Sequence, residues 1–393
     1  MEAFNNFVST INGFVWGPVM LCLLVGTHVF LTFRTGIIQR KTIKAIKLSV
    51  TPDKEASGDV SGFGALATAM AATIGTGNIV GVATAVGLGG PGSVLWVWLT
   101  GLFGMATKYS EAVLSIKYRV RAKDGSFIGG PMYALERGMG QKWLGILFAV
   151  FTAIACFGIG NMTQGNSIAE SVQNTFGISK IITGVVLTVI TGLCILGGVQ
   201  SISKVCEKLV PFMAVLYILL GVGLIVMNIS RVPAVFAAIF QGAFNPTAVT
   251  GGIVGSFFVA MQKGVSRGIF SNEAGLGTGS IAHACADTDK PVQQGMFGIF
   301  EVFMDTIVIC TVTALVILVS GISVPYGQDA GGTLTASAFA LVLGNWTGVA
   351  LAAAICCFAF TAILGWGLYG RCCAWFLFGS RGVQLFALLQ TAA

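Results

Sequence analysis

Glu273 is the residue whose type most needs an explanation, because it lies in a long apolar, glycine-rich segment. Carrying a carboxylate into the hydrocarbon core of a bilayer is unfavourable, so an acidic residue in a membrane span is a functional candidate. The surrounding motif, GVSRGIFSNEAGLGTGS, contains five glycines and predicts an interrupted helix. We expect this interruption to contact a substrate or an ion through Ser271, Asn272, Glu273, Gly275, Gly277 and Thr278.

A similar interruption, Gly75-Thr76-Gly77-Asn78, lies in another apolar run, five predicted helices earlier. Alone, such a glycine pair would indicate close helix packing. Two broken helices in corresponding places of two halves instead indicate a transport site at the middle of the membrane. The N-termini of half-helices offer free N–H groups and a positive dipole end to a carboxylate, and unwound carbonyls can hold a small cation. This chemistry fits a zwitterionic amino acid that travels with a monovalent cation.

The composition excludes other broad classes. Of 393 residues, 55% are hydrophobic and only 9% are charged, against roughly 25% charged in a soluble domain. A soluble enzyme is thereby excluded, and a polytopic helical membrane protein is expected. The net charge of +7 comes from basic residues clustered between apolar stretches, which argues against a nucleic-acid partner. Ten scattered cysteines predict no disulfide framework, and His28 and His283 form no metal-ligand pattern. The first ten residues lack the basic stretch of a cleavable signal peptide, so none is expected.

Nine membrane-spanning helices are predicted from long runs without charged residues, since a bilayer needs about 20 apolar residues per helix. One lies at about 14–33, and two lie within 61–107 on either side of a turn at 87–92. The others lie at about 143–169, 178–203, 209–228, 247–285, 294–320 and 349–378. The segment 332–344 is too short to span and is expected to form a helix on the membrane face.

Basic residues in the short loops set the predicted orientation. They gather in alternate loops: Arg34, Arg40, Lys41, Lys44, Lys47 and Lys54; Arg119, Arg121, Lys123, Arg137 and Lys142; Lys204 and Lys208; and Arg371 and Arg381. The opposite loops are nearly bare of basic residues. The N-terminus is therefore expected outside the cell membrane and the basic loops in the cytoplasm.

The sequence resembles the alanine or glycine:cation symporter family in four runs: GFGALATAMAATIGTGNIVGVATA, GGPMYALERGMG, GVSRGIFSNEAGLGTGSIAHA and FAFTAILGWGLYG. The resemblance reaches to about Gly379, and GIFSNEAGLG is its most specific part. It implies an all-α membrane fold of the bacterial leucine/sodium transporter type, with ten core helices in two inverted repeats.

In that fold, residues 1–393 would form a single transmembrane domain. Residues 14–33 would be an extra N-terminal helix, 62–228 the first repeat and 247–378 an incomplete second repeat. The tail, 382–393, is too short to cross a bilayer. The last two core helices are therefore expected to be missing, and the tail to lie at the cytoplasmic side.

The resemblance further implies which residues bind the substrate. Thr76, Gly77 and Asn78 would contact it at the earlier break, with Gln164 on core helix three, and Trp366 would cap its small side chain. Three of these residues have an alternative interpretation. Asn78 could be an ordinary hydrogen bonder between helices, Gln164 a helix-end cap and Trp366 a packing residue.

For the co-transported cation, the resemblance places backbone carbonyls near Ala71 and Ile74 opposite Thr361 and the carbonyl of Phe358. Oxygen ligands suit a hard ion such as Na⁺. A threonine in a membrane helix can instead bond back to its own helix, and this alternative stays open for Thr361.

Charged residues inside the predicted spans occur in pairs that share a helix face. Lys263 and Arg267 could line an outer vestibule, pair with Glu273 or extend to the membrane surface. Glu301 and Asp305 could pair with a basic residue of another helix or lie on an ion path. The basic candidate is Lys108, which is expected with Glu111 near a cytoplasmic gate.

The sequence therefore predicts a secondary transporter, not an enzyme, that imports alanine and/or glycine with Na⁺ by alternating access. It is expected to act as a monomer in the lipid bilayer. The alternatives are a proton-coupled carrier of another small amino acid, with Glu273 as the proton site, and a truncated member that does not transport. A channel is disfavoured because no filter-like sequence is visible. A membrane enzyme is disfavoured because no group of residues that could act together in catalysis is visible. The choice between alanine and glycine, the acceptance of D-isomers, the choice between Na⁺ and H⁺, and the stoichiometry stay open.

Overall fold

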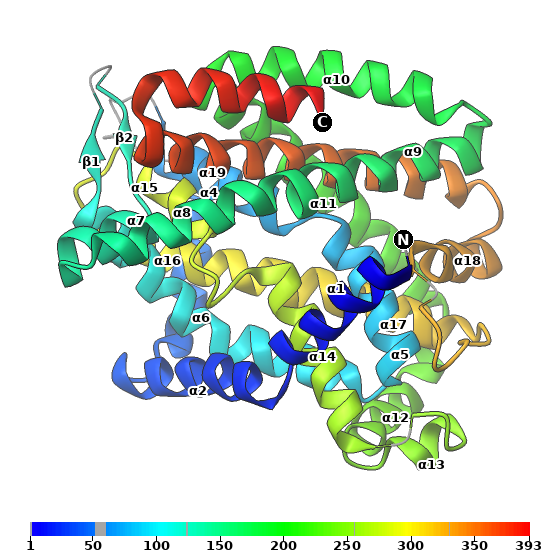
Figure 1. Cartoon of the computed structure of the whole chain (residues 1–393). Coiled ribbons are helices and arrows are strands. Elements are labelled where there is room, and N and C mark those ends of the chain that lie inside the picture. The colour runs from blue at the N-terminus through cyan, green and yellow to red at the C-terminus, as the bar shows by residue number, and fades with distance from the viewer. Residues whose placement is uncertain (1, 52–59, 123–124, 255, 330) are drawn as a thin grey trace.

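The chain folds into a bundle of helices with one short antiparallel hairpin, β1 (Val120–Arg121) and β2 (Phe127–Ile128) (Figure 1). The computed structural model describes residues 2–51, 60–122, 125–254, 256–329 and 331–393. Lys54 and Lys123, two of the basic loop residues, lie outside the described residues.

The N-terminal part forms a helical arm beside the bundle. It contains α1 (Glu2–Val15), α2 (Pro18–Arg34), η1 (Ile38–Lys41) and α3 (Thr42–Ser49). A turn at Trp16 and Gly17 separates the first two helices, because Gly17 is extended and proline occupies the first position of α2. The expected helix at 14–33 is therefore confirmed as α2, with a further helix before it.

The first predicted break is present. Helix α4 (Gly62–Thr73) ends before the break, and the π-helical turn η2 (Gly77–Gly81) continues into α5 (Val82–Gly89). The helix after the break is bent by 46° from α4. Ser61 begins α4 by accepting a hydrogen bond from the Gly64 N–H, at 2.8 Å. After the turn that includes Gly90, α6 (Ser93–Tyr118) runs to the hairpin.

The middle of the chain contains short elements and longer helices: α7 (Pro131–Tyr133), η3 (Ala134–Gly138), α8 (Lys142–Phe157), η4 (Gly158–Met162), α9 (Thr163–Phe176), α10 (Lys180–Leu196) and α11 (Gly198–Met227). The predicted boundary between 203 and 209 is wrong. The chain turns at Gly197 and Gly198, where Gly198 has a φ of +80°. Lys204 and Lys208, expected in a loop, lie within α11.

The next segment differs from the predicted span at 247–285. It contains η5 (Ile229–Arg231), α12 (Val232–Phe244), α13 (Pro246–Thr250), α14 (Phe257–Asn272) and α15 (Gly279–Ala284). The span begins at Phe257, where Ser256 caps the helix. Helix α12 was not predicted, because its 13 residues are too few to cross a bilayer. The predicted second break is present between α14 and α15.

The C-terminal part contains α16 (Pro291–Val302), the π-helical η6 (Phe303–Cys310), α17 (Thr311–Ser320), α18 (Gly331–Leu343) and α19 (Thr347–Ala392). The short helix expected at 332–344 is confirmed as α18. Helix α19 reverses at Gly379, which has a φ of +68° and a ψ of −158°.

The tail, which was expected at the cytoplasmic side, packs back along the helices of the bundle. After Gly379 the chain turns back as a helix beside α10 (Figure 1). The Phe386 ring lies 5.2 Å from the Phe157 ring, and the Asn161 side chain donates a hydrogen bond to the Gln390 carbonyl, at 2.8 Å. Phe386 and Ala387 are buried in this contact, which rests on van der Waals packing and hydrogen bonds.

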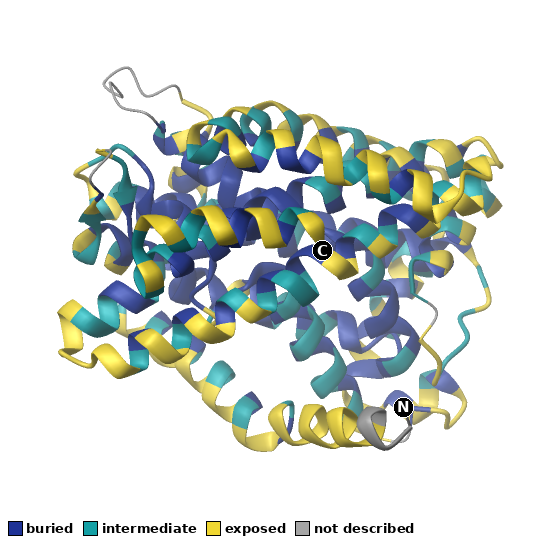
Figure 2. Cartoon of the chain, turned by 45° about the horizontal axis from the view of Figure 1, so that its top comes forward, coloured by how far each residue is buried: buried dark blue, intermediate teal, exposed yellow. Residues whose placement is uncertain are grey.

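The outer surface of the bundle is apolar. In the described part of the chain, five helices are long and apolar enough to cross a membrane, and six when the bent pair α4 and η2–α5 counts as one span. Large apolar side chains such as Phe151, Leu193 and Leu219 are more than 60% exposed. Figure 2 shows exposed residues along the outer helices and buried residues in the centre. Such a surface suits a lipid environment, and the chain is a multi-pass membrane protein.

Candidate functional site

The two helix breaks lie against each other in the centre of the bundle. Beyond Thr73 the chain leaves the helix at Ile74, which has a ψ of 82°. The Gly75 N–H donates to the Asn78 side-chain oxygen at 2.9 Å, so Asn78 closes the first break. At Gly77 a Cβ would lie 3.3 Å from the Ser271 Cα and 3.1 Å from the Phe270 ring. Glycine is therefore what allows the two backbones to approach.

Asp305 joins both breaks through one carboxylate. Its Oδ1 accepts hydrogen bonds from the Asn78 side-chain amide at 2.7 Å and from the Ser271 hydroxyl at 2.9 Å. Its Oδ2 accepts from the Thr306 hydroxyl at 2.7 Å. All four side chains are buried. The Asn272 side-chain amide also donates to the Thr306 hydroxyl, at 3.1 Å, so two residues of the second break face η6.

Sequence reasoning gave Asp305 no place in the site, although it was a candidate for an ion path. The available signal was its position in an apolar helix, four residues after Glu301. The π-helical stretch η6 separates the two side chains. Asp305 faces the breaks, and Glu301 pairs with Lys108 instead.

Gln164 and Trp366 both lie close to π-helical or broken backbone. The Thr76 N–H donates to Gln164 Oε1 at 3.4 Å, and the Gln164 side-chain amide donates to the Ile159 carbonyl at 3.2 Å. Gln164 is therefore at the first break. Trp366 packs against η4, where a Cβ at Gly160 would lie 2.7 Å from the Trp366 Cγ.

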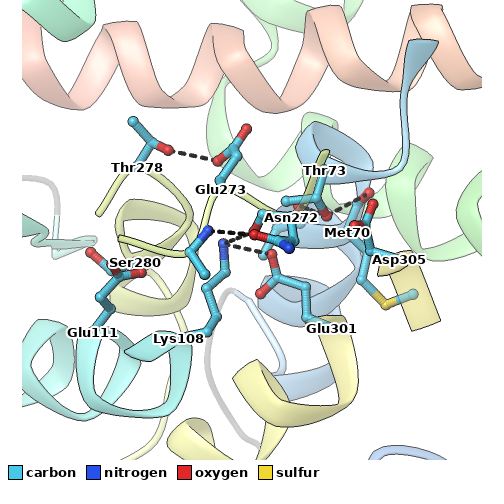
Figure 3. Close-up of polar contacts among 12 residues, drawn as sticks. Met70, Thr73, Lys108, Glu111, Asn272, Glu273, Thr278, Ser280, Glu301 and Asp305 are labelled. Atoms are coloured by element: carbon cyan, nitrogen blue, oxygen red, sulfur yellow. Dashed lines mark hydrogen bonds and ion pairs between the residues drawn. The ribbon is translucent and has the colours of Figure 1, made fainter. Parts of the chain in front are cut away.

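Within the second break, Glu273 adopts the left-handed conformation, with a φ of +56°. Its Oε2 accepts a hydrogen bond from the Thr278 hydroxyl at 2.6 Å (Figure 3). Among the described residues Glu273 has no ion pair with Arg267, whose guanidinium lies 5.8 Å from the Phe270 ring centre. The pairing with Glu273, one of three alternatives given for Arg267, is therefore absent.

Gly275 and Gly277 face away from the first break. A Cβ at Gly275 would lie 3.0 Å from the Leu24 side chain of α2. A Cβ at Gly277 would lie 2.6 Å from the Pro131 side chain. Both residues have positive φ, so they shape the turn between the half-helices. Of the six residues predicted at this break, Ser271 and Asn272 are the ones whose side chains bond toward Asp305 and Thr306.

A second polar cluster lies behind the breaks. Lys108 Nζ is 3.0 Å from Glu301 Oε1, and both side chains are fully buried. The other Glu301 oxygen is 2.8 Å from His283 Nε2, and His283 Nδ1 is 2.7 Å from the Gln294 side-chain amide. Pairing of Glu301 with Lys108 was one of the sequence expectations and is confirmed. The hydrogen bond between His283 and Glu301 was not predicted, because the spacing of residues along the chain does not show that α15 packs against α16.

The predicted cation ligands lie on α4, just beyond its end at Ile74, and on α19, and the two helices pack closely. A Cβ at Gly365 would lie 2.7 Å from the Ala72 Cβ, and a Cβ at Gly75 would lie 3.2 Å from the Ala362 Cβ. Thr361 is adjacent to this contact. Its hydroxyl donates to the Phe358 carbonyl and to the Cys357 carbonyl, both at 3.0 Å. Thr361 therefore bonds back to its own helix, which is the alternative left open for it, and Ala71 and Ile74 are buried.

Comparison with known proteins gives a consistent picture. The sodium/alanine symporter AgcS of Methanococcus maripaludis is 48% identical over 394 residues, which cover 98% of this chain and 86% of that protein. An uncharacterized transporter of Haemophilus influenzae is 48% identical over 388 residues, or 98% of this chain and 85% of that protein. The probable sodium/glutamine symporter GlnT of Bacillus subtilis is 37% identical over 373 residues, which cover 94% of this chain and 77% of that protein.

Among solved structures, the crystal structure of a mutant manganese transporter of Eremococcus coleocola matches with a TM-score of 0.57. It covers 87% of this chain and 71% of that chain at 12% sequence identity, which shows a shared fold and nothing about substrate.

The sequence model of the sodium:alanine symporter family matches residues 1–393, which is the whole chain. The chain is thus a transporter and not an enzyme, with Na⁺ as the co-transported ion of its family. The full-length match agrees with the high identity to named symporters and with the paired helix breaks in an apolar bundle. The chain therefore belongs to the sodium:alanine symporter family.

Proposed function

We propose that this chain imports alanine, glycine or both, together with Na⁺, across the cell membrane by alternating access. The observation that carries the proposal is the meeting of two broken helices, where Asn78 and Ser271 share the carboxylate of Asp305. Such a junction joins elements that can move relative to each other, so ligands bound there can bias the equilibrium between two states. The name of AgcS, a sodium/alanine symporter 48% identical to this chain, supports alanine as the substrate.

The substrate carboxylate is proposed to bind the main-chain N–H groups of Thr76, Gly77 and Asn78. The Thr76 N–H has only a long hydrogen bond to Gln164, at 3.4 Å, so a carboxylate oxygen can replace that acceptor. The positive end of the half-helix dipole would stabilise the charge without an arginine. Arg267 lies over Phe270 and is not proposed as the principal partner.

Close packing around the first break supports a small substrate. A Cβ at Gly75 would lie 3.2 Å from the Ala362 Cβ and one at Gly77 would lie 3.1 Å from the Phe270 ring, and the buried Trp366 lies on α19 after Gly365. Trp366 is proposed to cover the substrate side chain. Extra methylenes would then have to displace packed backbone, which is more unfavourable than filling a roomy pocket.

The Na⁺ ligands are proposed to be the Ala71 and Ile74 carbonyls, the Phe358 carbonyl and the Thr361 hydroxyl. In this arrangement the ion would join the first broken helix to α19.

We further propose that 62–228 and 247–378 form two inverted repeats and that the N-terminus lies outside. Fluorescent protein fused after Ser49, which is fluorescent only when it stays in the cytoplasm, checks the orientation.

Uptake by purified protein in liposomes tests the function. Radiolabelled alanine and glycine are supplied with an inward Na⁺ gradient, and choline replaces Na⁺ in the matched control. Accumulation only with the Na⁺ gradient is expected. Accumulation driven by a proton gradient without Na⁺ would contradict the ion assignment, and uptake of glutamine in place of alanine would contradict the substrate.

A further inference from the structure

Helix α6 contacts the second break with two oppositely charged side chains. Lys108 and Glu111 are three residues apart, so they share one helix face. Lys108 Nζ donates a hydrogen bond to the Asn272 carbonyl at 3.1 Å. Glu111 Oε1 accepts a hydrogen bond from the Gly275 N–H at 2.9 Å. Figure 3 shows Lys108 directed between Asn272 and Glu301.

The signs of the two charges match the polarity of the break. Asn272 is the last residue of α14, and the final carbonyls of a helix lack partners and carry the negative end of the dipole. An ammonium group is the complementary donor. Gly275 lies in the non-helical turn with a φ of +88°, so its N–H has no helical acceptor, and a carboxylate supplies one. Hydrogen bonds to charged groups are stronger than neutral ones.

Lys108 is itself held in place from a third direction. Its ammonium pairs with Glu301 of α16, and Glu301 is bonded to His283 of α15. A Cβ at Gly279, the first residue of α15, would collide with the Lys108 ammonium. Both half-helices are therefore packed onto one α6 side chain, which is fully buried.

We propose that Lys108 and Glu111 are positioning residues that hold the backbone of the second break in its binding shape. This inference rests on the proposed function. Neither side chain needs to touch the substrate. Lys108 fixes Asn272, whose neighbour Ser271 donates to Asp305, and Glu111 fixes the turn three residues further on. Without them the turn samples other conformations, and the binding-competent fraction and the apparent affinity fall together.

Two variants of Glu111 provide the first test. Glu111→Gln keeps a side-chain oxygen that can accept from the Gly275 N–H, and Glu111→Met has similar length but no such acceptor. Loss of one hydrogen bond to a charged group corresponds to about a tenfold change in an equilibrium. We expect the alanine concentration for half-maximal uptake to rise about tenfold in Glu111→Met, with a smaller change in maximal rate. Glu111→Gln should recover most of the affinity.

A double variant tests Lys108 without leaving a buried charge alone. Lys108→Met with Glu301→Gln removes both charges, and glutamine can still accept from His283. A raised half-maximal alanine concentration is again expected, with a thermal midpoint in detergent near that of the parent. Leu102→Met, on an exposed position of the same helix, is the control and should leave uptake unchanged.

Hydrogen exchange of the peptide that contains Gly275 gives a readout independent of any substrate. Faster exchange is expected in Glu111→Met and parental exchange in Glu111→Gln. If both variants exchange and transport like the parent, the positioning role is wrong. If exchange changes as expected but the parent shows no Na⁺-dependent uptake, the positioning role stands and the proposed function fails.

Discussion

Asp305 decides how the polar groups of the two breaks are satisfied. Two donors from different broken helices, Asn78 and Ser271, meet on a single oxygen, and Thr306 occupies the other. Buried donors that lose their acceptor are strongly unfavourable, more so than the net gain from making the bond. The carboxylate is therefore needed both for the site and for the packing of α14 against η2.

Two substitutions of Asp305 should distinguish the contribution of its side-chain volume from the contribution of its hydrogen bonds. Asp305→Asn keeps Oδ1 for Asn78 and Ser271, and its amide can donate to the Thr306 hydroxyl, so the protein should fold. Asp305→Leu removes the carboxylate that accepts from three buried donors, Asn78, Ser271 and Thr306, of which the Asn78 amide keeps the backbone carbonyl of residue 305 at 3.1 Å. The substitution should reduce the free energy of unfolding by about 2 kcal/mol or more. Thermal unfolding in detergent measures both variants. Equal midpoints for asparagine and leucine would show that these bonds contribute nothing.

Thr361 tests the proposed ion site at the same scale. Thr361→Ala removes one oxygen and keeps the helix, because alanine is the best helix former. The Na⁺ concentration for half-maximal alanine uptake should rise about fivefold, as expected for losing about 1 kcal/mol. Saturating alanine should partly restore Na⁺ binding, because coupling is reciprocal. Thr188→Ala is the control, since Thr188 is exposed and bonds only to its own helix at Gly184. An unchanged Na⁺ dependence in Thr361→Ala would place the ion elsewhere.

At the scale of elements, the second half-helix α15 is held at its C-terminal end by Arg119, just after α6. The Arg119 guanidinium donates to the carbonyls of Ala284, Ala286 and Thr288 and lies 3.6 Å from the Phe127 ring centre. A short helix leaves several carbonyls unsatisfied, so one planar group with five donors replaces much of the missing hydrogen bonding. The hairpin and α15 are thereby joined.

Arg119→Met should loosen this end of α15, whereas Asp289→Asn should not. The Arg119 side chain is only 7% exposed and that of Asp289 is fully exposed, so their ion pair, at 3.4 Å, contributes little. We expect faster proteolysis between Ala284 and Lys290 in Arg119→Met, and parental rates in Asp289→Asn. Equal cleavage of both variants would mean that the carbonyl contacts do not hold the segment.

At the scale of the whole molecule, the reversed tail completes the packing of one face of the bundle. Phe386 contacts Phe157 and lies against Gly370, and the Gln390 carbonyl accepts from Asn161. Packing of this kind stabilises membrane helices through van der Waals contact and hydrogen bonds, since lipid removes most of the hydrophobic driving force.

Phe386→Ala should therefore lower stability, by on the order of 3 kcal/mol if the cavity stays open. Leu388→Ala is the matched control, because Leu388 is 58% exposed on the outer side of the same helix. The thermal midpoint in detergent should fall clearly for Phe386→Ala and hardly for Leu388→Ala. Similar midpoints for the two variants would contradict the packing of the tail.

Both helix breaks could be predicted, because several glycines close together weaken a helix at that point of an apolar run. Pairing of Lys108 with Glu301 was one of two alternatives that the need to neutralise charges in a membrane suggested, and the structure shows it. The boundary between α10 and α11 was wrong, since Lys204 and Lys208 were interpreted as loop residues although their side chains only had to reach the helix surface. The neighbours of Gly275 and Gly277 could not be predicted from the sequence. They depend on the backbone angles within the break, and both residues have a positive φ.

The amino-acid sequence was enough to predict the class of protein, a resemblance to the family and the two places where helices break. These features are local: composition, apolar run length and glycine spacing are written along the chain. The three-dimensional packing was needed to show that Asp305 joins the breaks, that His283 bonds to Glu301 and that α6 contacts both sides of the second break. Those contacts connect residues up to 227 positions apart. Which side chain reaches which depends on how helices pack and rotate, and helical periodicity along one segment does not specify this.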